Sequence, residues 1–101
     1  MIDNDKINSI IKERVSMHPD DPRIMNKWRE LTDIFTENQE DTIEFLNTCS
    51  EENVEWISEV FEDISEILQS SQFISCIEKL NDKFKDLNLD QDIRYAKEVI
   101  E

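Results

Sequence analysis

The 101-residue chain contains no glycine and only two prolines, Pro19 and Pro22. Glycine supplies the positive φ angles that most β-hairpins and tight sheet turns require, and proline marks many other turns. A chain without these residues has few ways to connect neighbouring strands. Apolar residues make up 38% of the sequence and recur at helical spacing, which distinguishes the chain from a disordered acidic tail. We therefore predict an all-α protein that folds as a single domain over residues 1–101.

Breaks in the apolar pattern divide the chain into five or six helices. The first is predicted from Asp3 to Ser16, where residues 18–22 end it. Asp21 is the predicted N-cap of the second helix and Pro22 its first residue, because the fixed φ of proline suits that position. The apolar face of this second helix carries Ile24, Trp28, Leu31 and Phe35.

The organisation of residues 22–48 has two readings. Thr36-Glu37-Asn38-Gln39 fits a capping box, which predicts a new helix with Thr36 as its N-cap. The alternative is one continuous helix over residues 22–48, since Thr42, Leu46 and Cys49 continue the same apolar face. We favour the break.

The clearest helix is predicted after Ser50, which is a suitable N-cap, and runs to Leu68. Its outward face is uniformly acidic and carries Glu55, Glu59, Glu62 and Glu66. Ser70-Ser71 and a loop at residues 86–88 then delimit the last two helices. Short connections between the helices predict antiparallel packing as successive helical hairpins, an arrangement that can also resemble a small two-layer solenoid.

Acidic residues are concentrated in the middle of the chain. No basic residue occurs between Arg29 and Lys79, whereas 14 of the 25 acidic residues do, and the other 11 balance the 11 basic residues. The formal net charge of −14 therefore belongs to this segment, which should repel nucleic acid and anionic lipid and attract a basic protein. The candidate partner-binding residues are Glu37, Glu40, Asp41, Glu44, Glu51, Glu52, Glu55, Trp56, Glu59, Glu62, Asp63 and Glu66.

The tryptophans indicate core and interface positions, and the histidine and cysteine residues indicate whether a catalytic or metal site is expected. Trp28 is central in its apolar face and is predicted to be core, whereas Trp56 lies at the margin of its acidic face, where tryptophans often anchor interfaces. His18 is the only imidazole, and no Glu-x-x-His pair is present. Cys49 and Cys76 are expected to be reduced, packed thiols. We expect no enzyme activity, no cofactor and no metal; an acid-site metalloenzyme is the remaining catalytic alternative.

The chain has no apolar run of the roughly 20 residues that cross a bilayer, and its first residues lack the basic start and apolar stretch of a signal peptide. We therefore expect a cytoplasmic protein with no membrane or nucleic-acid partner, monomeric when free.

One stretch resembles a known group of proteins. It reads Cys49-Ser50-Glu51-Glu52-Asn53-Val54-Glu55-Trp56-Ile57-Ser58-Glu59-Val60-Phe61-Glu62-Asp63-Ile64 and continues to Phe73 and Leu80. In charge, size and helical pattern, residues 22–100 are similar to small acidic helical immunity proteins of bacterial toxin systems, including contact-dependent growth inhibition. That resemblance implies a protein that binds one cognate toxin, often a nuclease, and blocks its active site.

Two functional hypotheses follow. In the first, the acidic faces of residues 37–66 bind a basic toxin domain, an RNase or DNase, by occupying the lysines and arginines that otherwise hold phosphate. In the second, the chain is a helical adaptor or regulatory subunit that receives a partner helix in an apolar groove, and the acidic residues only keep it soluble.

Overall fold

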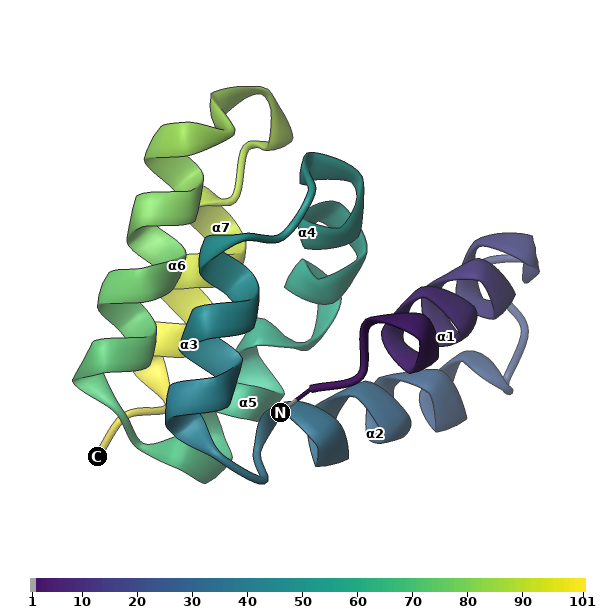
Figure 1. Ribbon diagram of the computed structural model, residues 1–101, viewed down its shortest axis with the longest axis horizontal. Coiled ribbons are helices and arrows are strands. Elements are labelled where there is room, and N and C mark those ends of the chain that lie inside the picture. The colour runs from purple at the N-terminus through teal and green to yellow at the C-terminus, as the bar shows by residue number, and fades with distance from the viewer. Residues whose placement is uncertain (1) are drawn as a thin grey trace.

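The chain is helical throughout the computed structural model, which describes residues 2–101 (Figure 1). The elements are α1 (Asn4–Ser16), α2 (Ile24–Phe35), α3 (Gln39–Asn47), α4 (Glu51–Ile57), the 3₁₀ turn η1 (Ser58–Val60), α5 (Phe61–Leu68), α6 (Ser71–Lys83), the 3₁₀ turn η2 (Lys85–Leu87) and α7 (Asp90–Glu98). α4, η1 and α5 follow one another without a gap and make one helical segment. Residues 2–101 contain no strand, which confirms the all-α prediction.

Short polar side chains begin several of these helices. Asp3 accepts hydrogen bonds from the amides of Asp5 and Lys6 at the start of α1. The Ser50 hydroxyl accepts the Asn53 amide at 3.2 Å, which confirms the predicted cap of α4. The start of α2 is later than predicted, at Ile24. Asp21 instead accepts the Arg23 amide at 2.9 Å and stabilises the turn that leads into the helix.

Residues 22–48 form two helices, as favoured, but the capping-box prediction at Thr36 is wrong. The Thr36 hydroxyl donates to the carbonyl of Thr32 at 2.7 Å and closes the end of α2. Asn38 is the N-cap of α3 and accepts the Asp41 amide at 3.0 Å. A threonine hydroxyl can hydrogen-bond to the backbone before it or after it in the chain, and the Thr36 hydroxyl bonds to the preceding helix, α2.

The predicted continuous helix from Ser50 to Leu68 is interrupted at η1. The hydroxyl of Ser58 donates to the carbonyl of Glu55 at 2.6 Å, three residues earlier, and the backbone tightens to 3₁₀ geometry over Ser58–Val60. Serine back-bonding and short 3₁₀ stretches both bend helices. The acidic side chains before and after η1 are therefore not on one straight helical face.

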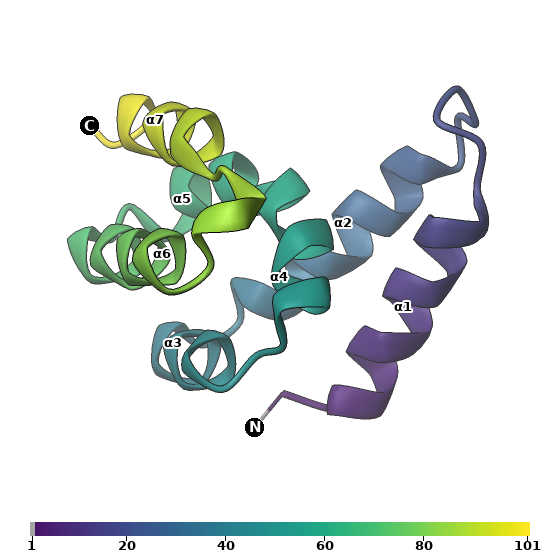
Figure 2. The same ribbon diagram turned by 90° about the horizontal axis from the view of Figure 1, so that it is seen from above.

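The helices pack only in part as successive hairpins. α1 and α2 form an antiparallel hairpin, which lies to one side of the other helices (Figures 1 and 2). α6 and α7 form a second one, in which Asn81 bonds Asp90 and Lys97 pairs with Glu78.

Two further pairs, α3 with α6 and α5 with α7, join helices that are not adjacent in sequence. Both pairs are parallel, since residues that touch across them advance together: Gln39 bonds Gln72 and Ile43 bonds Cys76, while Ser65 bonds Ala96 and Gln69 bonds Val99. The fold therefore combines two antiparallel hairpins with two parallel pairs.

A single hydrophobic core receives side chains from every α-helix. Phe61 and Phe73 meet edge to face at its centre, with ring centroids 6.1 Å apart. Trp28 is half-buried. Its ring packs against the core, as predicted, whereas its indole N–H donates to the carboxylate of Glu59. The largest fully buried side chains are Phe35, Phe61, Phe73, Ile7, Leu31, Leu46, Ile57, Ile64, Ile77, Leu89, Val54 and Val60.

Without glycine, two other residues take left-handed backbone conformations where helical elements end. Gln69 has φ 48° after α5 and Asn88 has φ 53° after η2. Gln69 also uses its side chain: the amide group donates to the Val99 carbonyl at 2.8 Å, and its oxygen accepts the Glu101 amide at 2.8 Å. This side chain joins the ends of α5 and α7 and so fixes their parallel pairing.

Two buried threonines allow a matched test of the core. The Thr42 hydroxyl donates to the buried Phe35 carbonyl at 2.6 Å, whereas the buried Thr32 hydroxyl has no hydrogen-bond partner among residues 2–101. Thr42→Val should lower the free energy of unfolding by about 1–3 kcal/mol, because a buried carbonyl loses its partner. The same change at Thr32 should leave stability unchanged or raise it. Chemical denaturation measures both, and equal losses would contradict the role assigned to the Thr42 bond.

Candidate protein-binding surface

The twelve sequence-predicted binding residues lie on three helices and their connections. α3 and the loop before it carry Glu37, Glu40, Asp41 and Glu44, and α4 carries Glu51, Glu52, Glu55 and Trp56. Glu59 lies in η1, and α5 carries Glu62, Asp63 and Glu66. Asp41 and Trp56 are half-buried and the other ten residues are classed as exposed.

These residues divide between two parts of the fold. A short loop connects α3 to α4, whereas α5 packs against α7 (Figures 1 and 2). We call Glu37, Glu40, Asp41, Glu44, Glu51, Glu52 and Glu55 the α3–α4 carboxylates, and Glu62, Asp63 and Glu66 the α5 carboxylates. We call the part of the molecule formed by α3, α4 and the loop before α3 the α3–α4 side, and it carries most of the predicted acidic set.

Basic side chains of the protein leave most of this set unneutralised. Their ion pairs join Arg14 to Glu59, Arg23 to Asp21, Lys27 to Glu13 and Glu30, Arg94 to Glu98, and Lys97 to Glu78. Among residues 2–101, nine of the predicted carboxylates take part in no ion pair; they are Glu37, Glu40, Glu44, Glu51, Glu52, Glu55, Glu62, Asp63 and Glu66. Their negative charge is therefore directed to the solvent.

Glu59 differs from these nine, because it keeps exposed surface, as expected, and is nevertheless paired within the same chain. Its two carboxylate oxygens accept Nε and Nη2 of Arg14 at 3.0 and 2.8 Å, and Oε1 also accepts the indole N–H of Trp28 at 3.1 Å. The side chains of Arg14 and Glu59 keep only 12% and 26% of their surface exposed. A bidentate arginine–carboxylate pair of this kind stabilises the packing of α1 and α2 on η1.

Trp56 belongs to the same cluster. The guanidinium carbon of Arg14 lies 5.1 Å from the centroid of its ring, which is a cation–π contact, and the ring packs against the core. The anchor role predicted for Trp56 stays a prediction, and the structure adds that one of its neighbours is already a cation of the same chain. Sequence reasoning missed this cluster because Arg14 and Glu59 are 45 positions apart.

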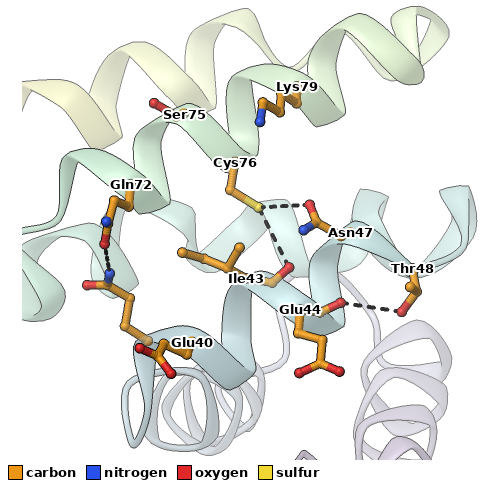
Figure 3. A pocket seen from close by; sticks show the side chains of 10 residues that line it. Glu40, Ile43, Glu44, Asn47, Thr48, Gln72, Ser75, Cys76 and Lys79 are labelled. Carbon is orange, nitrogen blue, oxygen red and sulfur yellow. Dashed lines mark hydrogen bonds between the residues drawn. The ribbon is translucent and has the colours of Figure 1, made fainter.

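A groove between α3 and α6 is the feature of this side that the sequence did not reveal. It has a volume of about 570 Å³ and opens to solvent. Its lining residues are Gln39, Glu40, Ile43, Glu44, Asn47, Thr48, Gln72, Ser75, Cys76 and Lys79. Figure 3 shows Cys76 reaching from α6 toward Ile43 and Asn47 of α3, where its thiol lies 4.0 Å from the Ile43 carbonyl and 3.7 Å from Asn47 Oδ1.

The residues with reactive side chains are placed as follows. Cys49 and Cys76 are free and buried. Burial raises the pKa of the Cys49 thiol to about 11, and burial likewise raises the pKa of Cys76, so neither thiol is activated as a nucleophile at neutral pH. His18 is exposed in the turn between α1 and α2. Residues 2–101 contain no group of three or more histidine, cysteine or acidic side chains that could hold a metal ion.

None of the helices described by the structure has the length and apolar character needed to cross a membrane. No protein-family model matches the chain, and no curated protein or solved structure is significantly similar to it.

Removing the charge of Glu59 tests whether its pair with Arg14 is structural. Glu59→Gln should lower the free energy of unfolding by about 2 kcal/mol, because it leaves a largely buried guanidinium without a counter-charge. The matched variant Glu55→Gln, at an exposed position without an ion pair, should change stability by less than about 0.5 kcal/mol. Chemical denaturation measures the free energy of unfolding of both variants. Similar losses would show that the Arg14–Glu59 pair contributes little to stability.

A second prediction concerns Asp92, which is half-buried in the first turn of α7. Burial, and then the negative charge of Glu59, raise the pKa of its carboxyl above the ordinary value of 3.8. Because the folded protein holds this proton more tightly than the unfolded chain, the ionised group costs stability once the pH exceeds its folded pKa. Below 3.8 the cost is absent.

Asp92→Asn should therefore melt at a higher temperature than the wild type at pH 7, and the difference should shrink as the pH falls toward 3.8. Thermal melts over this pH range measure it. Asp86→Asn, which removes the same charge at an exposed position of η2, serves as the control for the change in net charge. A constant difference for Asp92→Asn at every pH would contradict the explanation.

Proposed function

We propose that this protein is a cytoplasmic immunity protein that, as a monomer, binds and neutralises a basic toxin domain, a ribonuclease or deoxyribonuclease, and catalyses no reaction itself. The observation that carries the proposal is the set of nine exposed carboxylates without an ion pair among residues 2–101. We assign the main contact to the α3–α4 carboxylates, because this side holds most of the acidic set and the groove.

The energetic argument starts from the cost of the unpaired charges. Glu51 and Glu55, and Glu62 and Glu66, are like-charged pairs four residues apart on one helix, and each such pair destabilises the free protein by a few tenths of a kcal/mol. The ion pairs that the protein does form lie mainly on α1, α2, α6 and α7. A basic partner would offset the cost that the intramolecular contacts leave in place.

The chemistry of a nuclease active site fits such a surface. Nucleases hold phosphate with lysine and arginine side chains, and carboxylates fixed on helices can occupy those side chains in place of phosphate. The charge on the α3–α4 side would also steer the two proteins together, which gives fast association that weakens with added salt. The acidic surface repels nucleic acid itself, so the partner is the protein.

The groove between α3 and α6 favours a second candidate function, that of a helical adaptor which receives an apolar partner segment. In that case Ile43 and Cys76 would supply the binding energy, and the carboxylates would contribute only solubility. Such a complex would depend little on salt, because apolar contacts are not screened.

The proposal can be tested with the polypeptide encoded next to this chain in its genome. Co-expression should relieve the toxicity of that polypeptide, and the purified pair should associate at a rate that falls at least about tenfold from 0.05 to 0.5 M salt. Glu37→Lys/Glu55→Lys should slow association further at low salt. Asp82→Lys/Asp86→Lys changes the net charge equally, at exposed sites on α6 and η2, and should have a smaller effect.

Circular dichroism should show unchanged helicity in both double variants, so that a loss of binding reports the surface and not folding. A salt-independent rate would remove the electrostatic basis of the proposal and favour the adaptor. Equal slowing by the two double variants would mean that net charge matters and the α3–α4 side does not.

A further inference from the structure

The groove between α3 and α6 has a floor that is short of strong hydrogen-bond donors. Cys76 is 4% exposed and its thiol, a weak donor, faces the Ile43 carbonyl and Asn47 Oδ1 at 4.0 and 3.7 Å. Both oxygens therefore keep capacity for a stronger donor. The aliphatic carbons of Ile43 and the sulfur of Cys76 make the rest of this floor apolar (Figure 3).

The rim on the α3 side is negative. Glu40 and Glu44 are four residues apart on α3, so their side chains lie on the same face of the helix along the groove. Both are exposed and neither takes part in an ion pair among residues 2–101. Lys79, the basic residue that lines the groove, lies on α6 toward the end away from Glu40 (Figure 3).

We propose that the groove receives one arginine side chain of the bound partner, with its alkyl stem on Ile43 and Cys76 and its guanidinium held by Glu40 and Glu44. This inference rests on the proposed function, because it assumes a basic protein partner, and it names the group through which that partner is recognised. It assigns to the groove a specific occupant of the opposite charge.

Arginine suits the groove better than lysine for geometric reasons. Its guanidinium offers five N–H donors in a fixed plane and forms paired bonds with carboxylates, whereas an ammonium is a compact and strongly hydrated charge. The groove offers acceptors of both kinds: carboxylates at the rim and neutral oxygens of Ile43 and Asn47 at the floor. Arginine also buries an apolar stem together with its charged end, which matches a floor of aliphatic carbon and sulfur.

One end of the groove is already closed. The side-chain amide of Gln39 donates to the side-chain oxygen of Gln72 and thereby bridges the two walls near the starts of α3 and α6. An extended side chain can enter from solvent, whereas a whole helix would have to displace the Gln39–Gln72 bond.

The direct test uses the full chain and Nα-acetyl-arginine amide as the probe, followed by backbone amide NMR. The probe should shift amide signals of residues 39–48 and 72–79 in a saturable way. Nα-acetyl-citrulline amide has nearly the same shape without the charge and should bind about tenfold more weakly, because charge-assisted hydrogen bonds to carboxylates are lost.

Three variants separate this site from general attraction by an acidic protein. Glu40→Gln/Glu44→Gln should weaken binding of the arginine probe about tenfold. Glu62→Gln/Glu66→Gln removes the same two charges at the same spacing on α5 and should leave the probe affinity within about twofold. Lys79→Met should strengthen binding, since it removes a like charge from the opposite wall.

The inference is overturned if arginine and citrulline probes bind equally, if the shifts spread over all acidic helices, or if both glutamine double variants weaken binding alike. Formation of a dimer that buries the groove would also overturn it. The arginine site and the proposed function can fail independently. If Glu40→Gln/Glu44→Gln leaves a salt-dependent complex with the toxin unchanged, the inhibitor role is retained and the arginine site is rejected.

Discussion

The bidentate pair between Arg14 and Glu59 is the contact on which the assembly of this fold depends. It joins α1 to η1, while Trp28 adds α2 through its indole N–H and Trp56 adds α4 beneath the guanidinium. The α1–α2 hairpin lies to one side of the other helices and is held there by this cluster together with the apolar core. Three donors from two helices converge on one carboxylate, so the cluster fixes the orientation of these helices as well as adding stability.

With the hairpin docked in this way, the other helices stack as two parallel pairs with different outcomes. In the α5–α7 pair, the small residues Ser65 and Ala96 are fully buried and joined by a 2.6 Å hydrogen bond, so the helices meet closely. In the α3–α6 pair, Gln39 and Gln72 join the helices near their starts, and a groove lies between the helices beyond this bond. Two parallel pairs in one fold thus differ, since one is closely packed and the other leaves space between its helices.

Sequence patterns predicted the features that depend on neighbouring residues, and they did not predict the features that depend on contacts between distant residues. The all-α fold, the Ser50 cap and the break between α2 and α3 follow from local patterns and were correct. The ion pair of Glu59 with Arg14 was not predicted, because helical periodicity describes a single helix and these two residues are 45 positions apart. The parallel pairing of α3 with α6 was missed because it rests on contacts between residues 33 positions apart, which local patterns do not predict.

The distribution of exposed charge follows from which acidic residues form ion pairs with the basic residues of the chain. Five of them, Arg14, Arg23, Lys27, Arg94 and Lys97, pair with acidic residues of the same chain, and these pairs lie on the helices at its two ends and at η1. The helices between them therefore keep their negative charge exposed, at a cost in stability that a small core must offset. With a cationic partner of the kind proposed, the repulsion present in the free protein would be replaced by attraction in the complex. That difference between the free and bound states is the physical basis on which an acidic helical inhibitor can bind tightly without a large apolar interface.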